Sequence, residues 1–178
     1  MRYVISIPTV SDTFQKVAAV SSGGYTAAMN KSETWNDLRQ RASRIADLQG
    51  TSNLLSWDQE TLMPSGGTES RAHQMGTLAA LVHEYYTDPA FGDLLRELAS
   101  TLGDAMDPPA SDEAGIVRAM LRQHEQRTRV PKEFVIRRTE LSARAREAWK
   151  EARSTDSFAT FVPFLSQQFA LARELAGY

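Results

Sequence analysis

The sequence contains no cysteine, so the chain can form no disulfide framework, no thiolate zinc site and no cysteine nucleophile. No apolar run approaches the roughly 18 residues that cross a bilayer. The first ten residues also lack the apolar stretch and the cleavage site of a secretory signal. An excess of charge of one sign is missing too, because the formal net charge is −2 at pH 7. These absences predict a soluble, cytoplasmic protein with no membrane and no nucleic-acid partner.

The chain has 178 residues, which is enough for one domain with a substantial core. Residues 1–28 differ from the rest, because they are β-branched at first and then rich in serine and glycine. We predict that residues 1–28 form a poorly ordered N-terminal extension and that residues 29–178 form a helical domain.

Apolar residues recur at spacings of three and four from Ser32 onward, which is typical of amphipathic helices, and no strand pattern competes. Helix starts are indicated at Ser32, Thr68, Asp88–Pro89, Ser111, Pro131 and Asp156. The sequence therefore predicts an all-α fold of about six or seven helices in antiparallel hairpins. Gly50 leaves two possibilities for the first arm, one long bent helix or two shorter helices.

The most distinctive stretch is a corner between two helical segments. Pro64 disfavours the helical conformation at Met63, and the two glycines that follow permit positive φ. Thr68 is predicted to be the N-cap of the next helix, with its hydroxyl accepting a hydrogen bond from a free backbone amide. The residues thus predict a helical hairpin whose corner carries one indole and several polar side chains: Trp57, Asp58, Gln59 and Glu60.

This corner lies in the run SWDQETLMPSGGTESRAHQMGTLAALVHE. That run resembles the N-terminal part of the thermostable (Taq-type) zinc carboxypeptidases. Further points of resemblance are Val130-Pro131, Asp156-Ser157-Phe158, Phe161, Pro163, Leu165 and Arg173-Glu174. The resemblance covers roughly residues 35–178.

The resemblance implies an all-helical, usually dimeric metallopeptidase that removes C-terminal residues from peptides. In that family an H-E-x-x-H helix and a downstream glutamate hold the zinc ion. This sequence contains no H-E-x-x-H motif. Zinc is therefore expected only in the full-length family fold, and no cofactor is expected in this chain.

Two histidines are followed by glutamate, His83 and His124, but neither has a second histidine one helical turn later. An exposed or capping role is favoured for both over a metal-ligand role. The sequence also lacks the E-x-x-H motif of di-iron bundles and the G-x-S-x-G elbow of serine hydrolases. Basic side chains in excess between Arg118 and Arg153 are interleaved with glutamates, which is typical of a solvated helix face. We assign no catalytic and no metal-binding residue.

Trp57, Asp58, Gln59 and Glu60 are the candidate substrate-cleft residues. In the functional interpretation Trp57 and its polar neighbours line or brace a peptide-binding cleft, and Asp58 or Glu60 pairs with an arginine of the missing part. In the structural interpretation, which is favoured, Trp57 belongs to the core and Asp58 caps the corner of the hairpin.

The leading functional hypothesis is the N-terminal helical wall or lid of a zinc-dependent carboxypeptidase, separated from its catalytic part by truncation or by a break between genes. The alternative is a stand-alone helical interaction module without catalysis. Both predict an exposed apolar face that binds either the missing catalytic part or a second copy of the chain. Leu165, Phe169 and Leu175 are where we expect this unburied surface.

Overall fold

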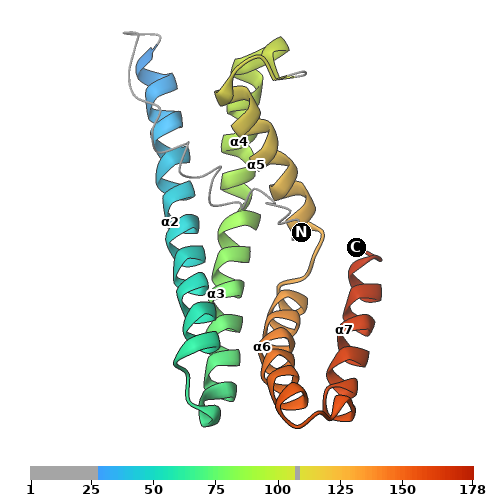
Figure 1. Cartoon of the computed structure of the whole chain (residues 1–178). Helices are drawn as coiled ribbons and strands as arrows, with labels where there is room; N and C mark the ends of the chain where they lie inside the picture. The colour runs from blue at the N-terminus through green and yellow to red at the C-terminus, as the bar shows by residue number, and fades with distance from the viewer. Residues whose placement is uncertain (1–27, 107–108) are drawn as a thin grey trace, which may run out of the picture. The chain divides into compact units, whose positions relative to one another are not determined.

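A computed structural model describes residues 28–106 and 109–178 of the protein. The predicted N-terminal extension lies outside these residues except for Ala28, and the division at residue 28 stays a prediction. The helices are α2 (Ala28–Thr61), α3 (Thr68–Thr87), α4 (Pro89–Leu102), α5 (Asp112–Thr128), α6 (Lys132–Ser154) and α7 (Val162–Leu175) (Figure 1). Short 3-10 helices are η1 (Ser65–Gly67), η2 (Gly103–Ala105) and η3 (Phe158–Thr160). The described residues form no strand, so the all-α prediction is confirmed.

The first arm is one helix. α2 continues through Gly50 for 34 residues, so of the two open possibilities the single helix is correct. A glycine inside a helix costs about 1 kcal/mol relative to alanine, which the long flanking turns of α2 outweigh. None of the described helices has a stretch long and apolar enough to cross a membrane.

The chain divides into two compact units. The described part of the first unit comprises residues 28–49 and 85–125, without residues 107–108. Its core is apolar and aromatic: Trp35, Leu38, Ile45, Tyr86, Phe91, Leu95, Leu98, Val117 and Met120. The Phe91 ring packs edge-on against Tyr86 and against the imidazole of His124. Arg41 joins α2 to the start of α4 through a 2.9 Å ion pair with Asp88.

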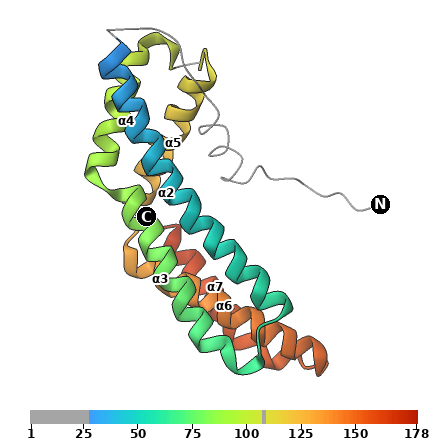
Figure 2. The same cartoon turned by 90° about the vertical axis from the view of Figure 1, so that its left-hand side faces the viewer.

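The second unit comprises residues 50–84 and 126–178. In both views the last turns of α2 run beside the first turns of α3, and η1 lies at the bend between them (Figures 1 and 2). α6 follows the predicted spacing, because Phe134, Leu141, Ala145, Ala148 and Ala152 are buried. Trp149 follows Ala148 in the same helix but is 42% exposed, with its ring edge-on to Phe161.

Two of the predicted N-caps are confirmed. Asp88 accepts a hydrogen bond from the Ala90 amide, with Pro89 in the first turn of α4. Ser111 accepts one from the Ala114 amide at the start of α5. At both positions an oxygen acceptor meets a backbone amide that the helix itself cannot pair.

The predicted start at Pro131 is also confirmed, because α6 begins at Lys132. The predicted caps at Ser32, Thr68 and Asp156 are wrong. The first described helix begins at Ala28, before Ser32. Thr68 has helical φ and ψ and donates its hydroxyl to the Ser65 carbonyl. Asp156 adopts a φ of 50°, and α7 begins only at Val162, after η3, with Pro163 in its first turn. At Ser32 and Thr68 the chain is already helical, and at Asp156 it turns before a later helix begins. A local capping pattern had predicted an N-cap at each position.

α7 is the least covered helix of the second unit. It has no buried residue, whereas α6 buries six. Phe169 is 57% exposed, and Leu165 and Leu175 are half-buried. The predicted unburied apolar surface is therefore found at Phe169, while Leu165 and Leu175 are only partly exposed.

The end of α7 is tied to α6 by an ion pair that should depend on pH. Arg137 Nη2 lies 2.6 Å from Glu174 Oε1, to which the Tyr178 hydroxyl also donates. The hydrogen bond from Arg137, with a second from Tyr178, holds the pKa of Glu174 below its usual range. A carboxyl whose pKa is lower in the folded state stabilises the fold above its unfolded pKa. That contribution is lost as the pH falls through the folded pKa.

We expect NMR titration of the Glu174 carboxyl carbon to give a pKa below that of an ordinary glutamate, because Arg137 favours the charged form. The substitution Arg137→Ala should return this pKa towards the ordinary value. Arg173→Ala, which removes a cation of α7 that does not pair with Glu174, is the matched control and should leave this pKa unchanged. Equal Glu174 titration in the wild-type protein and the Arg137→Ala variant would contradict the pairing.

Candidate functional site

The corner between α2 and α3 closes through its backbone. The amides of Leu62 and Met63 both donate to the Asp58 carbonyl at 2.9 Å, and Pro64 follows in an extended conformation. The two glycines of the corner do not use positive φ, since Gly103 is the only glycine with positive φ among the described residues. At Gly67 an added Cβ would lie 3.0 Å from Met63 Cγ, so any larger residue would require the Met63 side chain to shift.

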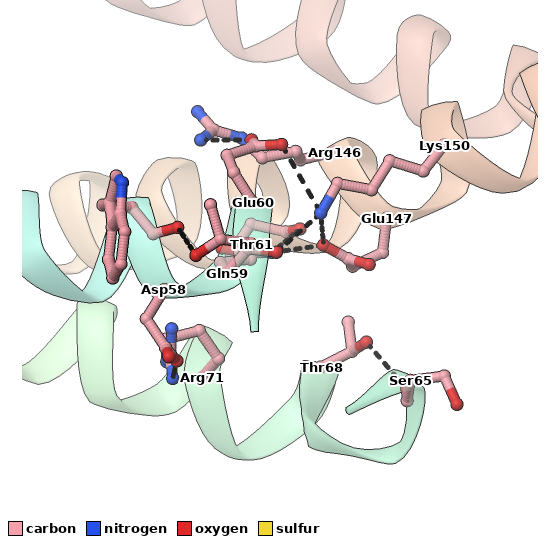
Figure 3. A network of polar contacts seen from close by, with 12 residues as sticks. Asp58, Gln59, Glu60, Thr61, Ser65, Thr68, Arg71, Arg146, Glu147 and Lys150 are labelled. Atoms are coloured by element: carbon pink, nitrogen blue, oxygen red, sulfur yellow. Dashed lines mark hydrogen bonds and ion pairs between the residues drawn. The ribbon is translucent and has the colours of Figure 1, made fainter. Parts of the chain in front are cut away.

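Gln59 points into the second unit and is 2% exposed. Its Nε2 donates to the Ala143 carbonyl and to Glu147 Oε1, each at 3.0 Å (Figure 3). Lys150 donates to the Gln59 carbonyl at 2.6 Å and to the Glu147 carboxylate at 3.0 Å. The last turn of α2 is thus fixed to the middle of α6 by a buried amide.

The two acids of the corner pair with arginines of this chain. Asp58 Oδ2 lies 2.5 Å from Arg71 Nη2 on α3, and the same guanidinium donates to the Leu55 carbonyl. Glu60 pairs with Arg146 at 2.8 Å on α6 (Figure 3). Both acids therefore have arginine partners within this chain, whereas the functional interpretation expected an arginine of the missing part. Asp58 closes the corner with its backbone carbonyl, while its side chain holds α3.

Trp57 is not a core residue, so that part of the structural interpretation is wrong. Its side chain is 57% exposed, and its neighbours Leu54 and Leu62 are 63% and 71% exposed. The next residues along the helix are anchored by Arg71, Glu147 and Arg146. The arrangement therefore presents an exposed indole beside three side chains that are held in place. An indole held in this way offers a flat apolar surface with an N–H donor.

Both histidines considered as ligands are buried and bonded to backbone carbonyls. His83 Nε2 lies 2.8 Å from the Val130 carbonyl and 3.2 Å from that of Arg127, at the end of α5. His124 Nδ1 lies 2.7 Å from the Tyr86 carbonyl. The capping interpretation therefore fits both histidines, because Tyr86 lies in the last turn of α3, while the exposed interpretation is wrong for both.

A zinc site does not fit the described side chains. No group of three or more histidine, aspartate or glutamate residues within residues 28–106 and 109–178 could hold a metal ion. His73 Nδ1 lies 3.1 Å from Glu140 Oε1, and Glu140 also pairs with Arg144. We derive no chemical step through a metal from these residues.

Comparison with known proteins identifies relatives over most of the chain. The family model described as carboxypeptidase Taq (M32) metallopeptidase matches residues 37–178. Thermostable carboxypeptidase 1 of Thermus thermophilus is 31% identical over 148 residues, which are 83% of this chain and 29% of that protein. Thermostable carboxypeptidase 1 of Pyrococcus furiosus is 30% identical over the same shares. Carboxypeptidase 1 of Bacillus subtilis is 28% identical over 80% of this chain and 27% of its own length.

The chain thus spans less than a third of the length of the curated relatives that it matches. No solved structure matches the chain significantly.

Proposed function

The chain belongs to the carboxypeptidase Taq (M32) metallopeptidase family, and from this membership we propose that it forms the N-terminal helical wall or lid of a larger zinc-dependent carboxypeptidase. The whole enzyme would remove C-terminal amino acids from peptides, as the names of the relatives indicate. This chain would form one side of the substrate cleft and contact the bound peptide.

The motifs of the sequence support a catalytic part that lies outside this chain. Zinc peptidases of the H-E-x-x-H type need two imidazoles on one metal and a glutamate that activates water. This sequence has no such motif, and the relatives are more than three times as long as the matched segment. The zinc ligands and the general base would therefore come from residues outside this chain. We expect no peptide hydrolysis from these 178 residues alone.

The observation that carries the proposal is the exposed indole of Trp57 at a braced corner. Asp58, Gln59 and Glu60 would position this corner through their contacts with α3 and α6, and only Trp57 would touch the peptide. An aromatic surface suits the apolar and peptide-plane groups of an extended substrate, and such contacts contribute about 1 kcal/mol.

The substitution Trp57→Ala in the complete enzyme should raise KM about fivefold, since a loss of about 1 kcal/mol in binding corresponds to a factor of about five. The value of kcat should change little, because the contact is equal in the ground state and the transition state. The free energy of unfolding should stay within about 0.5 kcal/mol of wild type. Steady-state kinetics on a peptide with a free C-terminus measures both constants.

Phe158→Ala is the matched control, because Phe158 is a similarly exposed aromatic residue, at 56%, on η3. It should leave KM unchanged. Equal KM values for wild type and the Trp57→Ala variant would contradict a substrate contact at this corner.

A stand-alone helical interaction module is the second candidate function. The uncovered surface of α7 favours it, because an exposed apolar helix in a mature protein marks a binding surface. The two candidates differ in whether the native protein also contains a catalytic part.

A further inference from the structure

A groove lies between α6 and α7 in the second unit, with a volume of about 340 Å³. Most of its lining is apolar, and the lining includes one cation, Arg138. The residues that line it include Arg138, Leu141, Leu165, Phe169, Ala172 and Leu175. Its position differs from that of the Trp57 corner, whose contacts involve α2, α3 and the C-terminal half of α6.

The groove is open because the side chains of α7 remain exposed or only half-buried. No α7 residue is buried, and Phe169 exposes 57% of its side chain at the edge of the groove. Phe91 and Phe134, elsewhere in the chain, are at most 1% exposed. An apolar strip of this kind beside a groove is typical of a surface that receives another helix.

The positive charge of Arg138, which lines the groove, favours a partner with a negative charge. Arg137 is paired with Glu174, but the guanidinium of the neighbouring Arg138 is exposed and meets no acceptor among the described residues. An unpaired guanidinium beside an apolar wall favours a partner that brings a carboxylate, which it can bind through two parallel hydrogen bonds.

A second copy of this chain would not supply a negative charge for Arg138 if the same groove met itself. The groove lining contains no acidic residue, so the same surface of a second copy would bring another arginine against Arg138. The single acid of α7, Glu174, is already paired with Arg137. Like charges brought together at an interface oppose association.

We propose that the α6–α7 groove is the docking site for an amphipathic helix of the catalytic part, with an apolar face against Phe169 and Leu165 and an aspartate or glutamate opposite Arg138. This inference rests on the proposed function. The relatives carry about 70% of their length outside the matched segment, which is ample chain for such a helix. Docking there would hold the wall formed by this chain against the catalytic part.

Photo-crosslinking in the native assembly tests the occupant of the groove. Phe169 is replaced in cells by p-benzoylphenylalanine, which keeps the aromatic ring. Gln167, exposed on the same helix and outside the groove lining, is replaced in the same way as the control. After irradiation the purified protein is digested, and the peptides joined to this position are identified by mass spectrometry.

We expect the Phe169 probe to join a peptide from the part that carries H-E-x-x-H, with at least tenfold higher yield than the Gln167 probe. A product between two copies of residues 28–178, a product with an unrelated protein, or equal low yields at the two positions would each overturn the docking proposal. An active, zinc-dependent enzyme with any of these products would still leave the proposed function standing. A native protein without a catalytic part would remove the proposed function itself.

The charge requirement has its own test. Arg138→Glu should lower the yield of the Phe169 product at least fivefold, because it places like charges across the groove. Arg122→Glu makes the same change on α5, at an exposed arginine outside the groove, and should have no effect. Equal yields in the two variants would contradict the pairing of Arg138 with a carboxylate of the partner.

Discussion

Gly92→Ala should lower the free energy of unfolding by about 3 kcal/mol, a large effect for the addition of one methyl group. Gly92 is buried in the first turn of α4, against the imidazole of His124. A Cβ on Gly92 would lie 2.8 Å from His124 Cε1 and closer still to Nε2. The imidazole is held on its other side by the Tyr86 carbonyl, 2.7 Å from Nδ1, so relief of the clash would break this buried hydrogen bond.

Gly50→Ala is the matched control. Gly50 also lies within a helix, but a Cβ there would meet nothing within 4 Å. This variant should be more stable than wild type by up to about 1 kcal/mol, because alanine has the higher helix propensity. Urea denaturation followed by circular dichroism measures both changes. A Gly92→Ala variant as stable as wild type would show that α4 and α5 do not pack as closely as described.

Gln59→Glu should destabilise the second unit by about 3 kcal/mol at neutral pH, which is the usual scale for an uncompensated buried charge. The native amide donates to the Ala143 carbonyl and to Glu147. A carboxylate at this position cannot donate and repels Glu147. Burial and a neighbouring negative charge both raise the pKa of such a group. The defect should therefore shrink as the pH is lowered and the new carboxyl is protonated.

Gln167→Glu makes the same chemical change on the exposed side of α7 and should alter stability by less than about 0.5 kcal/mol at any pH. Thermal unfolding at pH 7 and pH 5 compares the two variants. A Gln59→Glu variant that is unaffected at pH 7, or whose defect is the same at both pH values, would contradict the buried contact between α2 and α6.

The sequence predicted the helices well because their signals are local. Periodic apolar positions, Asp88 beside Pro89 and Ser111 before two acids all act within one or two turns. The failures have a common cause, because Ser32 and Asp156 also carry local capping patterns that neighbouring turns override. Glu140 and Arg144 form the ion pair that a spacing of four residues favours. Arg137 also has a glutamate four residues before it, Glu133, but pairs with the distant Glu174.

The site was predictable in residue type and less so in geometry. Trp57 to Glu60 stood out by composition, but the burial of Gln59 depends on Glu147, 88 residues away in sequence. No local pattern gives that separation. Gly92 and His124 likewise carry no sequence signal for their contact, since the two residues lie on different helices. Contacts of this kind follow from the packing of helices, which the period of a single helix does not determine.

The most direct test of whether this chain is the wall of a larger carboxypeptidase is the intact mass of the native protein, captured from its source with an antibody against residues 28–178. The 148 matched residues are 29% of the Thermus thermophilus relative, which corresponds to a chain of about 510 residues. We expect a native protein of about that size. A mass near 19.8 kDa, that of the 178 residues alone, would contradict the proposal and leave a helical module whose open α6–α7 groove binds something else.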